Sequence, residues 1–230
     1  MSSTSHPGPA MPDRLRKFLF LADLTDSELA ALAGLIKTRS FRKGELILRE
    51  EDTAHFMYLI FSGKVKVVQT SPEGKEQILA IHKRGEFFGE MALLDGRTSP
   101  AAVVALEESE VGLITRADFE REFLGHGKIV RRLMAILCTR LRDAWLMLKV
   151  LSFADAEERV RAVLRHLSTI HGVRDDRGII LTIKLTHREI ADYTSLSRET
   201  VTRVLNKFTD NGKIAVLDEK KLLLFNTFFL

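Results

Sequence analysis

The stretch SLSRETVTRVLNKF, Ser195–Phe208, combines a capping serine, a polar face with two arginines and an apolar stripe. At about 100° per residue, its large apolar side chains gather on one side of a helix, at Val201, Val204, Leu205 and Phe208. Ser197 is the predicted N-cap, because its hydroxyl can accept a hydrogen bond from a free backbone N–H of the first turn. The pattern therefore predicts a helix that begins at Arg198, buries one face and exposes the other.

The segments on either side of this helix complete a larger motif. Thr186 and Glu189 have the spacing of a capping box at the start of a shorter helix, LTHREIADYT. A short helix, a tight turn and a longer helix with a basic leading end predict a helix-turn-helix. Beyond it, Asn211 and Gly212 predict a turn, and KIAVL and LLLF predict a hairpin wing whose own turn lies around 218–221.

The polar face of the helix has the composition of a DNA-reading surface. The major groove admits one helix, and the guanidinium fork of arginine can bond guanine O6 and N7 together. Predicted base-reading residues are Arg198, Glu199, Thr202 and Arg203, with Asn206 on the same face. Predicted phosphate contacts are Thr186, His187, Arg188, Ser197, Lys207 and Lys213. The alternative is a polar face that is simply solvated.

Upstream, the sequence changes from helical to strand-like patterning. Thr25 and Glu28 again have capping-box spacing. Between about Ser40 and Ile114, regularly placed glycines separate short apolar runs such as FMYLIF, KVKVVQ and AAVVA. Short strands with such frequent turns predict an antiparallel sandwich or barrel.

A long helix is predicted from about Ile129 to 150, because apolar residues recur at steps of three and four. The stripe comprises Ile129, Leu133, Ile136, Leu137, Leu141, Trp145 and Leu148. Such a stripe either packs on its own domain or forms a seam with a second copy, and we favour the seam. A hinge around 153–155 follows, with Asp155 as the cap of the next helix.

The composition limits the number of domains, the kinds of partner and the metal sites that the chain can have. The chain has 230 residues, 45% of them hydrophobic, and a formal charge of +4, which suits two small domains and permits a polyanionic partner. Cys138 is the single cysteine, so a four-cysteine zinc site or a cysteine-ligated iron–sulfur cluster is excluded, and a cytoplasmic location is expected. We expect residues 1–12 to be a disordered tail and no segment to span a membrane.

The motifs resemble those of the Crp/Fnr family of bacterial transcription regulators. SRETV followed by arginine stands here from Ser197 to Arg203, and FRKGELILREED, MYLIFSGKVKVV and FFGEMALLDG resemble that family's cyclic-nucleotide-binding jelly roll. The resemblance implies an α+β chain: a jelly-roll sensor domain at 13–127, a dimerisation helix and hinge at 128–154, and a winged helix-turn-helix at 155–230. It also implies a homodimer, joined through the helix around 129–150, on a palindromic double-stranded DNA site of the TGTGA type. RNA polymerase is the further partner it implies, and the loop 171–178 corresponds to a polymerase-contacting loop or is an ordinary charged hairpin.

The resemblance is weaker in the ligand pocket. Gly89 and Glu90 match the family's glycine and ribose-binding glutamate, and the candidate pocket comprises Gly89, Glu90, Met91, Arg97, Thr98, Ser99 and Trp145. Aligning the flanks places Ser99 and Pro100 where the family has an Arg-Ser pair for the cyclic phosphate. Proline lacks an N–H and serine carries no charge, so the main phosphate anchors are lost. A shortened loop that uses Arg97 and Thr98 instead is the less favoured alignment.

The purine side of the pocket also departs from the family, because Ala144 and Trp145 replace a Thr-Ser pair. Trp145 either stacks on a base or fills an empty pocket, which we favour. No cofactor is required by the sequence. We expect DNA binding that is independent of an effector or controlled by a ligand other than cyclic AMP, such as a cyclic dinucleotide. Haem, through His55, His82 or His126, is a minor alternative.

Other functional classes remain as alternatives. The sequence contains no G-x-S-x-G, P-loop, H-E-x-x-H or C-x-x-C motif, so we do not expect an enzyme. A cyclic-AMP-activated regulator of the same family is the nearest alternative. A nucleotide-binding regulatory module without DNA binding is another, and the wing and helix-turn-helix pattern argues against it.

Overall fold

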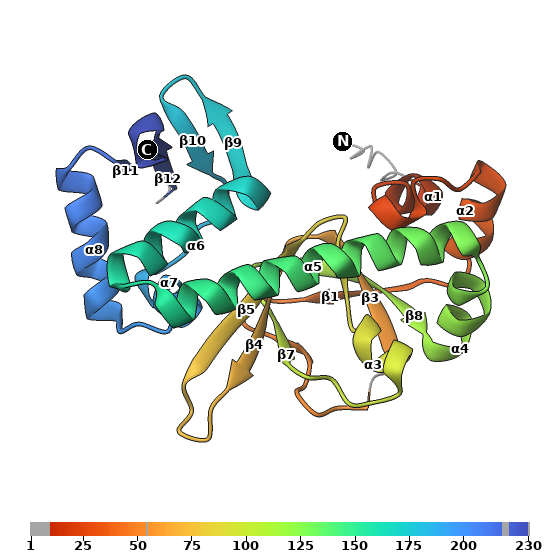
Figure 1. Ribbon diagram of the computed structural model, residues 1–230. Helices are drawn as coiled ribbons and strands as arrows, with labels where there is room; N and C mark the ends of the chain where they lie inside the picture. The colour runs from red at the N-terminus through yellow and green to blue at the C-terminus, as the bar shows by residue number, and fades with distance from the viewer. Residues whose placement is uncertain (1–9, 54, 218–220, 230) are drawn as a thin grey trace, which may run out of the picture. The chain divides into compact units, whose positions relative to one another are not determined.

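Two units divide the chain, and each is described by itself. The computed structural model describes residues 10–53, 55–217 and 221–229. The first unit comprises residues up to 69 together with 79–141, and the second comprises 70–78 together with 142–230. Figure 1 colours the chain from red at its start to blue at its end.

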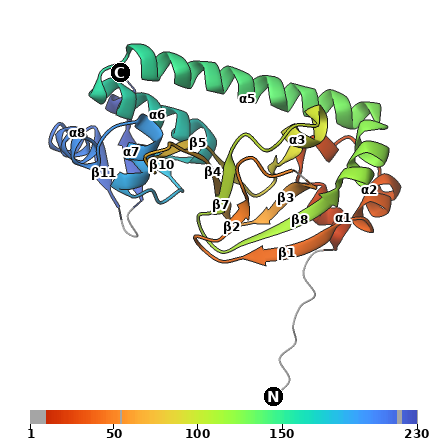
Figure 2. The ribbon, with the colours of Figure 1, turned by 90° about the horizontal axis from the view of Figure 1, so that it is seen from below.

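The first unit is built on two four-stranded sheets, which Figure 2 shows from below. One has the order β1 (Lys37–Phe41), β8 (Ser109–Thr115), β3 (Phe56–Ser62), β6 (Phe87–Phe88). The other has the order β2 (Leu46–Leu48), β7 (Ala102–Ala105), β4 (Lys64–Thr70), β5 (Glu76–Lys83). The pairings β1–β8, β3–β8 and β4–β7 are antiparallel, and the buried cluster of Ile60, Val65, Val103 and Val111 draws side chains from both sheets. The expected jelly roll is confirmed.

Short helices complete the first unit around a phenylalanine-rich core. They are α1 (Met11–Leu15), η1 (Leu19–Leu21), α2 (Asp26–Ala33), α3 (Glu90–Asp95), α4 (Arg116–Asp118) and the π-helical η2 (Phe119–Leu124). Buried rings of Phe18, Phe20, Phe87 and Phe123 pack among them. The predicted capping box is present, since Thr25 and Glu28 exchange side-chain and backbone hydrogen bonds. These contacts fix the start of α2.

The expected tail at residues 1–12 is contradicted at its end, where a helix is present. Residues 1–9 lie outside the described residues, and α1 already begins at Met11, within the segment 1–12. Pro12 lies in the first turn of this helix, where its missing N–H has no intrahelical partner to lose. Pro12 therefore suits the start of a helix.

The long helix α5 runs from Gly127 to Phe153, slightly longer at both ends than predicted. Its first turns are buried in the core of the first unit, with Ile129 1% and Leu133 2% exposed. Farther along, Met134, Leu141, Trp145 and Leu148 are exposed at 49 to 64%, and Cys138 is exposed as well. The apolar stripe is thus divided between residues that pack on their own unit and residues that meet solvent in the single chain.

The second unit is a winged helix-turn-helix. Its helices are α6 (Ala156–His171), α7 (His187–Thr194), α8 (Arg198–Asp210) and the short η4 (Asn226–Phe228). Its sheet has the order β11 (Ile214–Val216), β12 (Leu222–Phe225), β10 (Gly178–Leu181), β9 (Gly172–Asp175). Strands β11 and β12 pair antiparallel as the predicted wing, and residues 218–220 of its turn lie outside the described residues. Asp155 caps α6 as expected, accepting from the Glu158 N–H.

Candidate nucleic-acid interface and sensor pocket

Helix α8 begins at Arg198, as predicted, because Ser197 caps it by accepting a hydrogen bond from the Thr200 N–H at 3.1 Å. Its inner face is buried through Val201, Val204, Leu205 and Phe208. Phe208 also packs edge-on against Phe228, with the Arg161 guanidinium over both rings. This packing leaves the opposite face of the helix to solvent.

The outer face of α8 brings the predicted base-reading residues together. They line one open hollow with residues from the end of the helix: Arg198, Glu199, Thr202, Arg203, Asn206, Lys207, Asp210 and Asn211. Arg198, Glu199 and Arg203 are exposed, whereas Thr202 is only partly so. The Thr202 hydroxyl donates to the Arg198 carbonyl and lies 2.8 Å from Nδ1 of His187. Of the predicted base-reading residues, Thr202 is therefore the one held by hydrogen bonds within the described chain.

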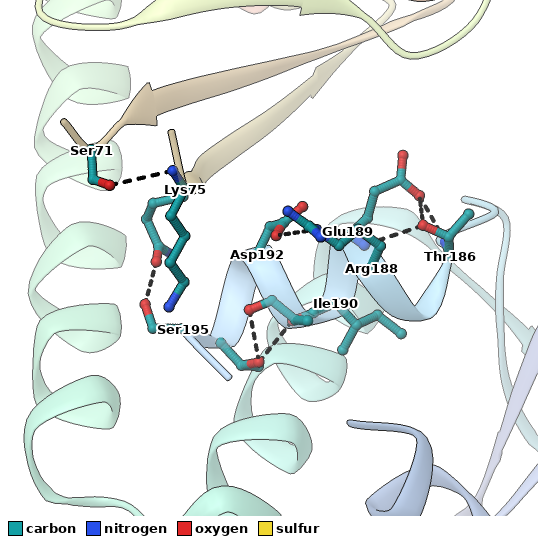
Figure 3. Close-up of polar contacts among 11 residues, drawn as sticks. Ser71, Lys75, Thr186, Arg188, Glu189, Ile190, Asp192 and Ser195 are labelled. Carbon is teal, nitrogen blue, oxygen red and sulfur yellow. Dashed lines mark hydrogen bonds and ion pairs between the residues drawn. The ribbon is translucent and has the colours of Figure 1, made fainter. Parts of the chain in front are cut away.

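The predicted phosphate contacts lie around this face, and several are paired within the chain. His187 contacts Thr202, while the Arg188 guanidinium pairs with the buried Asp192 at 3.1 Å, a contact drawn in Figure 3. Thr186 and Ser197 serve as helix caps. Each cap lies where free N–H groups at a helix start favour an anion.

Lys207, like Arg188, pairs with an acidic residue of the chain. Its Nζ donates to Glu157 at 2.5 Å, and Arg161 pairs with the same carboxylate at 3.0 Å. The hydrogen bond from Lys207 holds the pKa of Glu157 below its usual range, so the carboxylate stays charged near neutral pH. Lys213, at the start of the wing, is partly exposed.

The turn between the two helices has a strained backbone at Ser195. Ser195 adopts φ 54° and ψ 35°, the left-handed region in which glycine is favoured. Its N–H still donates to the Ala191 carbonyl, which ends α7. The motif therefore forms with serine at this position.

In the first unit, Gly89 joins β6 to α3, and Glu90 is the first residue of α3. Gly89 has φ 82°, and a Cβ there would lie 2.8 Å from the Phe56 carbonyl oxygen. Glu90 is only 3% exposed, and its carboxylate accepts from Arg140 Nη1 at 2.9 Å. Arg140 also donates to the Phe87 carbonyl at 2.6 Å and lies over the Phe87 ring. The glutamate is therefore held by an arginine of α5.

Ser99 is turned into the protein instead of toward a ligand. Its hydroxyl donates to the Ala101 carbonyl at 2.8 Å, and its N–H donates to the Asp52 carbonyl at 2.9 Å. Its own carbonyl accepts from the Glu51 N–H. The backbone groups of Ser99 thus hold its loop against residues 51–52. Arg97, Thr98 and Met91 are exposed.

Trp145 does not fill a pocket of its own chain, so that favoured interpretation was wrong. The side chain is 63% exposed. It shares the outer stripe of α5 with Leu141 and Leu148, each spaced by three or four residues. The sequence could not separate the two faces of α5, because both carry apolar residues at helical spacing.

Two of the three histidines considered as haem ligands contact a carboxylate instead. His82 pairs with Glu86 and His126 with Glu28, each at 3.1 Å. Within the described ranges, no group of three or more histidine, cysteine, aspartate or glutamate residues could hold a metal ion. No helix in the described part of the chain has the length and apolar character needed to cross a bilayer.

Two polar residues with notable contacts were missed from the sequence. Arg140 follows Leu133 and Ile136 at steps of three and four residues, on the buried side of the helix. A basic residue at such a position indicates an acidic partner, and this could have been noticed in the sequence. Gln77 contacts the helix-turn-helix turn through Tyr193 and Ser195. A glutamine in a polar hairpin carried no comparable signal.

Comparisons with known proteins agree with both halves of the chain. The cyclic nucleotide-binding domain family matches residues 38–126, and the Crp-like helix-turn-helix domain family matches residues 158–226. The second match argues against a nucleotide-binding module that lacks a DNA-binding half. The curated relatives are described as receptor or regulatory proteins rather than enzymes.

Individual relatives give the same result. The "Cyclic AMP receptor protein" of Thermus thermophilus is 34% identical over 83% of this chain and 85% of its own length. A "CRP-like cAMP-activated global transcriptional regulator" of Mycobacterium tuberculosis is 29% identical over 86% of this chain and 88% of its own. The solved structure of FixK2 from Bradyrhizobium japonicum has a TM-score of 0.74 at 27% identity, covering 83% of this chain and 93% of that one. With a jelly roll, a long helix and a winged helix-turn-helix in this order, the chain belongs to the Crp/Fnr family of DNA-binding transcription regulators.

Proposed function

We propose that this chain regulates transcription as a homodimer joined through α5, and that it reads a palindromic TGTGA-type site without needing cyclic AMP. The observation that carries the DNA-reading part is the outer face of α8, where Arg198, Glu199 and Arg203 are exposed together above a buried core face. An exposed helix of this kind fits the major groove, and two-fold symmetry places two half-sites about one helical turn apart.

The proposed seam rests on the outer stripe of α5. Met134, Cys138, Leu141, Trp145 and Leu148 follow steps of four, three, four and three residues, which is the heptad spacing of a coiled coil. If the same helix of a second copy covered these side chains, their apolar surface would be removed from water, which favours association. The family relationship supports the same arrangement.

The proposed independence from cyclic AMP rests on two contacts in the sensor pocket. Glu90, which the resemblance assigns to the ribose hydroxyl, is buried and paired with Arg140. Ser99, at the position of the family's phosphate-binding arginine, has its hydroxyl and N–H bonded within its own loop. A cyclic nucleotide would have to break the Arg140–Glu90 pair and would find no cation at Ser99 in return.

A cyclic-AMP-activated regulator is the second candidate, because two of the relatives are named for cyclic AMP. Calorimetric titration of cyclic AMP into the purified protein separates the two candidates. We expect no binding at micromolar concentrations. Micromolar affinity would favour the second candidate. The double substitution Ser99→Arg with Pro100→Ser, which restores the family's pair, is the matched variant and should raise the affinity.

RNA polymerase is the further proposed partner. The segment His171–Gly178 forms the end of α6, strand β9 and the turn at 176–177, so it presents a charged hairpin. Arg177 pairs with Asp175 in this hairpin. Reversing the charge of Arg174, which lies on the same hairpin, should lower transcription activation and leave DNA affinity unchanged. An unchanged transcript level would remove this hairpin from the proposal.

A further inference from the structure

The tip of the β4–β5 hairpin, residues 70–78, belongs to the second unit and contacts the turn between α7 and α8. The Gln77 side chain makes this contact twice. Its Nε2 donates to the Tyr193 carbonyl at 3.2 Å, and its Oε1 accepts from the Ser195 hydroxyl. Figure 3 shows Ser195 lying against the hairpin segment that carries Ser71 and Lys75.

A glutamine amide suits this position because it offers a donor and an acceptor on one rigid plane. Tyr193 lies in the last turn of α7, where carbonyls can accept hydrogen bonds from outside the helix. Gln77 supplies a donor there from outside the helix. The same amide holds the hydroxyl of Ser195, which glycine at this position would not have.

The hairpin tip that carries Gln77 is itself held by hydrogen bonds. The Ser71 N–H donates to the Lys75 carbonyl at 2.9 Å, and the Gly74 N–H donates to the Ser71 carbonyl at 2.8 Å. The Ser71 hydroxyl accepts from the Lys75 N–H at 3.3 Å. Gly74 has φ 78°, the region that closes such a turn with least strain. Gln77 therefore extends from an ordered turn.

The turn that Gln77 holds leads directly into the DNA-reading helix. Ser195 is two residues before the N-cap Ser197, and Arg198 and Glu199 follow the cap. We propose that Gln77 is a positioning residue for α8: by holding Tyr193 and Ser195 it fixes the turn, and so the first turn of the helix that meets the bases. Serine at Ser195, despite its positive φ, is then the side chain that makes the contact possible.

The test combines hydrogen exchange with DNA binding in the full-length protein. Gln77→Ala should raise amide exchange across 193–198 and weaken binding to the specific duplex by about threefold to tenfold, the effect of one or two lost hydrogen bonds. Binding to a scrambled duplex should change little, because phosphate contacts do not depend on the exact approach of α8 to the bases.

Three further variants identify the contact. Ser195→Ala should weaken specific binding in the same direction, and combining it with Gln77→Ala should add less than the sum of the two effects. Gln77→Glu keeps an acceptor for Ser195 and loses the donor to Tyr193, so its effect should be intermediate. Gln69→Ala is the matched control, since Gln69 also donates to a carbonyl, that of Pro100, from the same hairpin. Its exchange across 193–198 and its DNA affinity should equal those of the wild type.

Unchanged exchange in Gln77→Ala would overturn the contact itself. Raised exchange with unchanged specific affinity would overturn the positioning role, and so would equal effects of Gln69→Ala. If the wild-type protein showed no preference for the chosen duplex, that would count against the proposed site sequence, and exchange across 193–198 would still decide whether Gln77 holds the turn.

Discussion

Arg203 is exposed on the outer face of α8 and points from the side of the helix opposite to its buried stripe. Arg203→Ala should weaken specific binding by about 1 to 3 kcal/mol and relax the preference at one base position, because a guanidinium reads a base edge through two bonds. Fluorescence anisotropy with duplexes varied one position at a time checks this. An equal loss on scrambled DNA would show that Arg203 contacts phosphate.

Lys213 is predicted to contact a phosphate, in contrast to Arg203, which is predicted to contact a base. Lys213→Ala should weaken binding to specific and scrambled duplexes alike. It should also reduce the slope of log affinity against log salt concentration by about one. Titrations at several salt concentrations give this slope. A loss confined to the specific duplex would place Lys213 at a base instead.

Glu28 has a pKa lowered by hydrogen bonds at the start of α2. The Thr25 N–H, then His126, then the Thr25 hydroxyl bond its carboxylate and lower its pKa to about 2 from 4.5. The unfolded chain binds the proton more readily, so stability from Glu28 is present above about pH 4.5 and is lost as pH falls toward 2. The melting temperature of the wild type should exceed that of Glu28→Gln at pH 6, with the difference shrinking at pH 3. A difference independent of pH would contradict this.

Single residues also show where sequence reasoning ended. The caps Thr25, Thr186 and Ser197 were predictable, because a cap acts on a backbone group three residues away. The pair of Arg140 with Glu90 was not, because its partners are 50 residues apart and meet only when α5 packs on β6 and α3. For the same reason, Gln77 could not be connected with Ser195 before the fold was known.

At the scale of elements, α5 shows both the success and the limit of periodicity. The spacing predicted the helix nearly to its ends. It could not divide the stripe, because Ile129 and Leu133 pack on their own unit while Leu141 and Trp145 remain exposed. The jelly-roll strands were predicted as a class from glycines and short apolar runs, whereas their order in two sheets required the structure.

The single cysteine tests the proposed seam directly. Cys138 lies in the heptad stripe of α5, so in a parallel dimer it faces the same residue of a second copy. Mild oxidation of dilute protein should give a covalent dimer on a non-reducing gel. The control moves the thiol about 100° around the helix with Cys138→Ser and Thr139→Cys, which should crosslink poorly. Equal crosslinking of both proteins, or none with Cys138, would contradict the seam.

Both halves of the chain match the family, whereas the proposed loss of control by cyclic AMP depends on a few residues of the first unit. The two family matches cover residues 38–126 and 158–226. Ser99 lies within the first match and bonds to the Ala101 carbonyl, whereas Arg140 follows that match in α5 and pairs with Glu90. The proposal is that this pocket leaves DNA binding independent of the nucleotide.

The most direct test is fluorescence anisotropy at one fixed salt concentration, titrating the wild-type protein onto a TGTGA-type palindrome and a scrambled duplex, each with and without cyclic AMP. We predict tight binding that is selective for the palindrome and equal in both conditions. Selective binding only in the presence of cyclic AMP would contradict the proposed independence and would mean that the Arg140–Glu90 pair opens to admit the nucleotide.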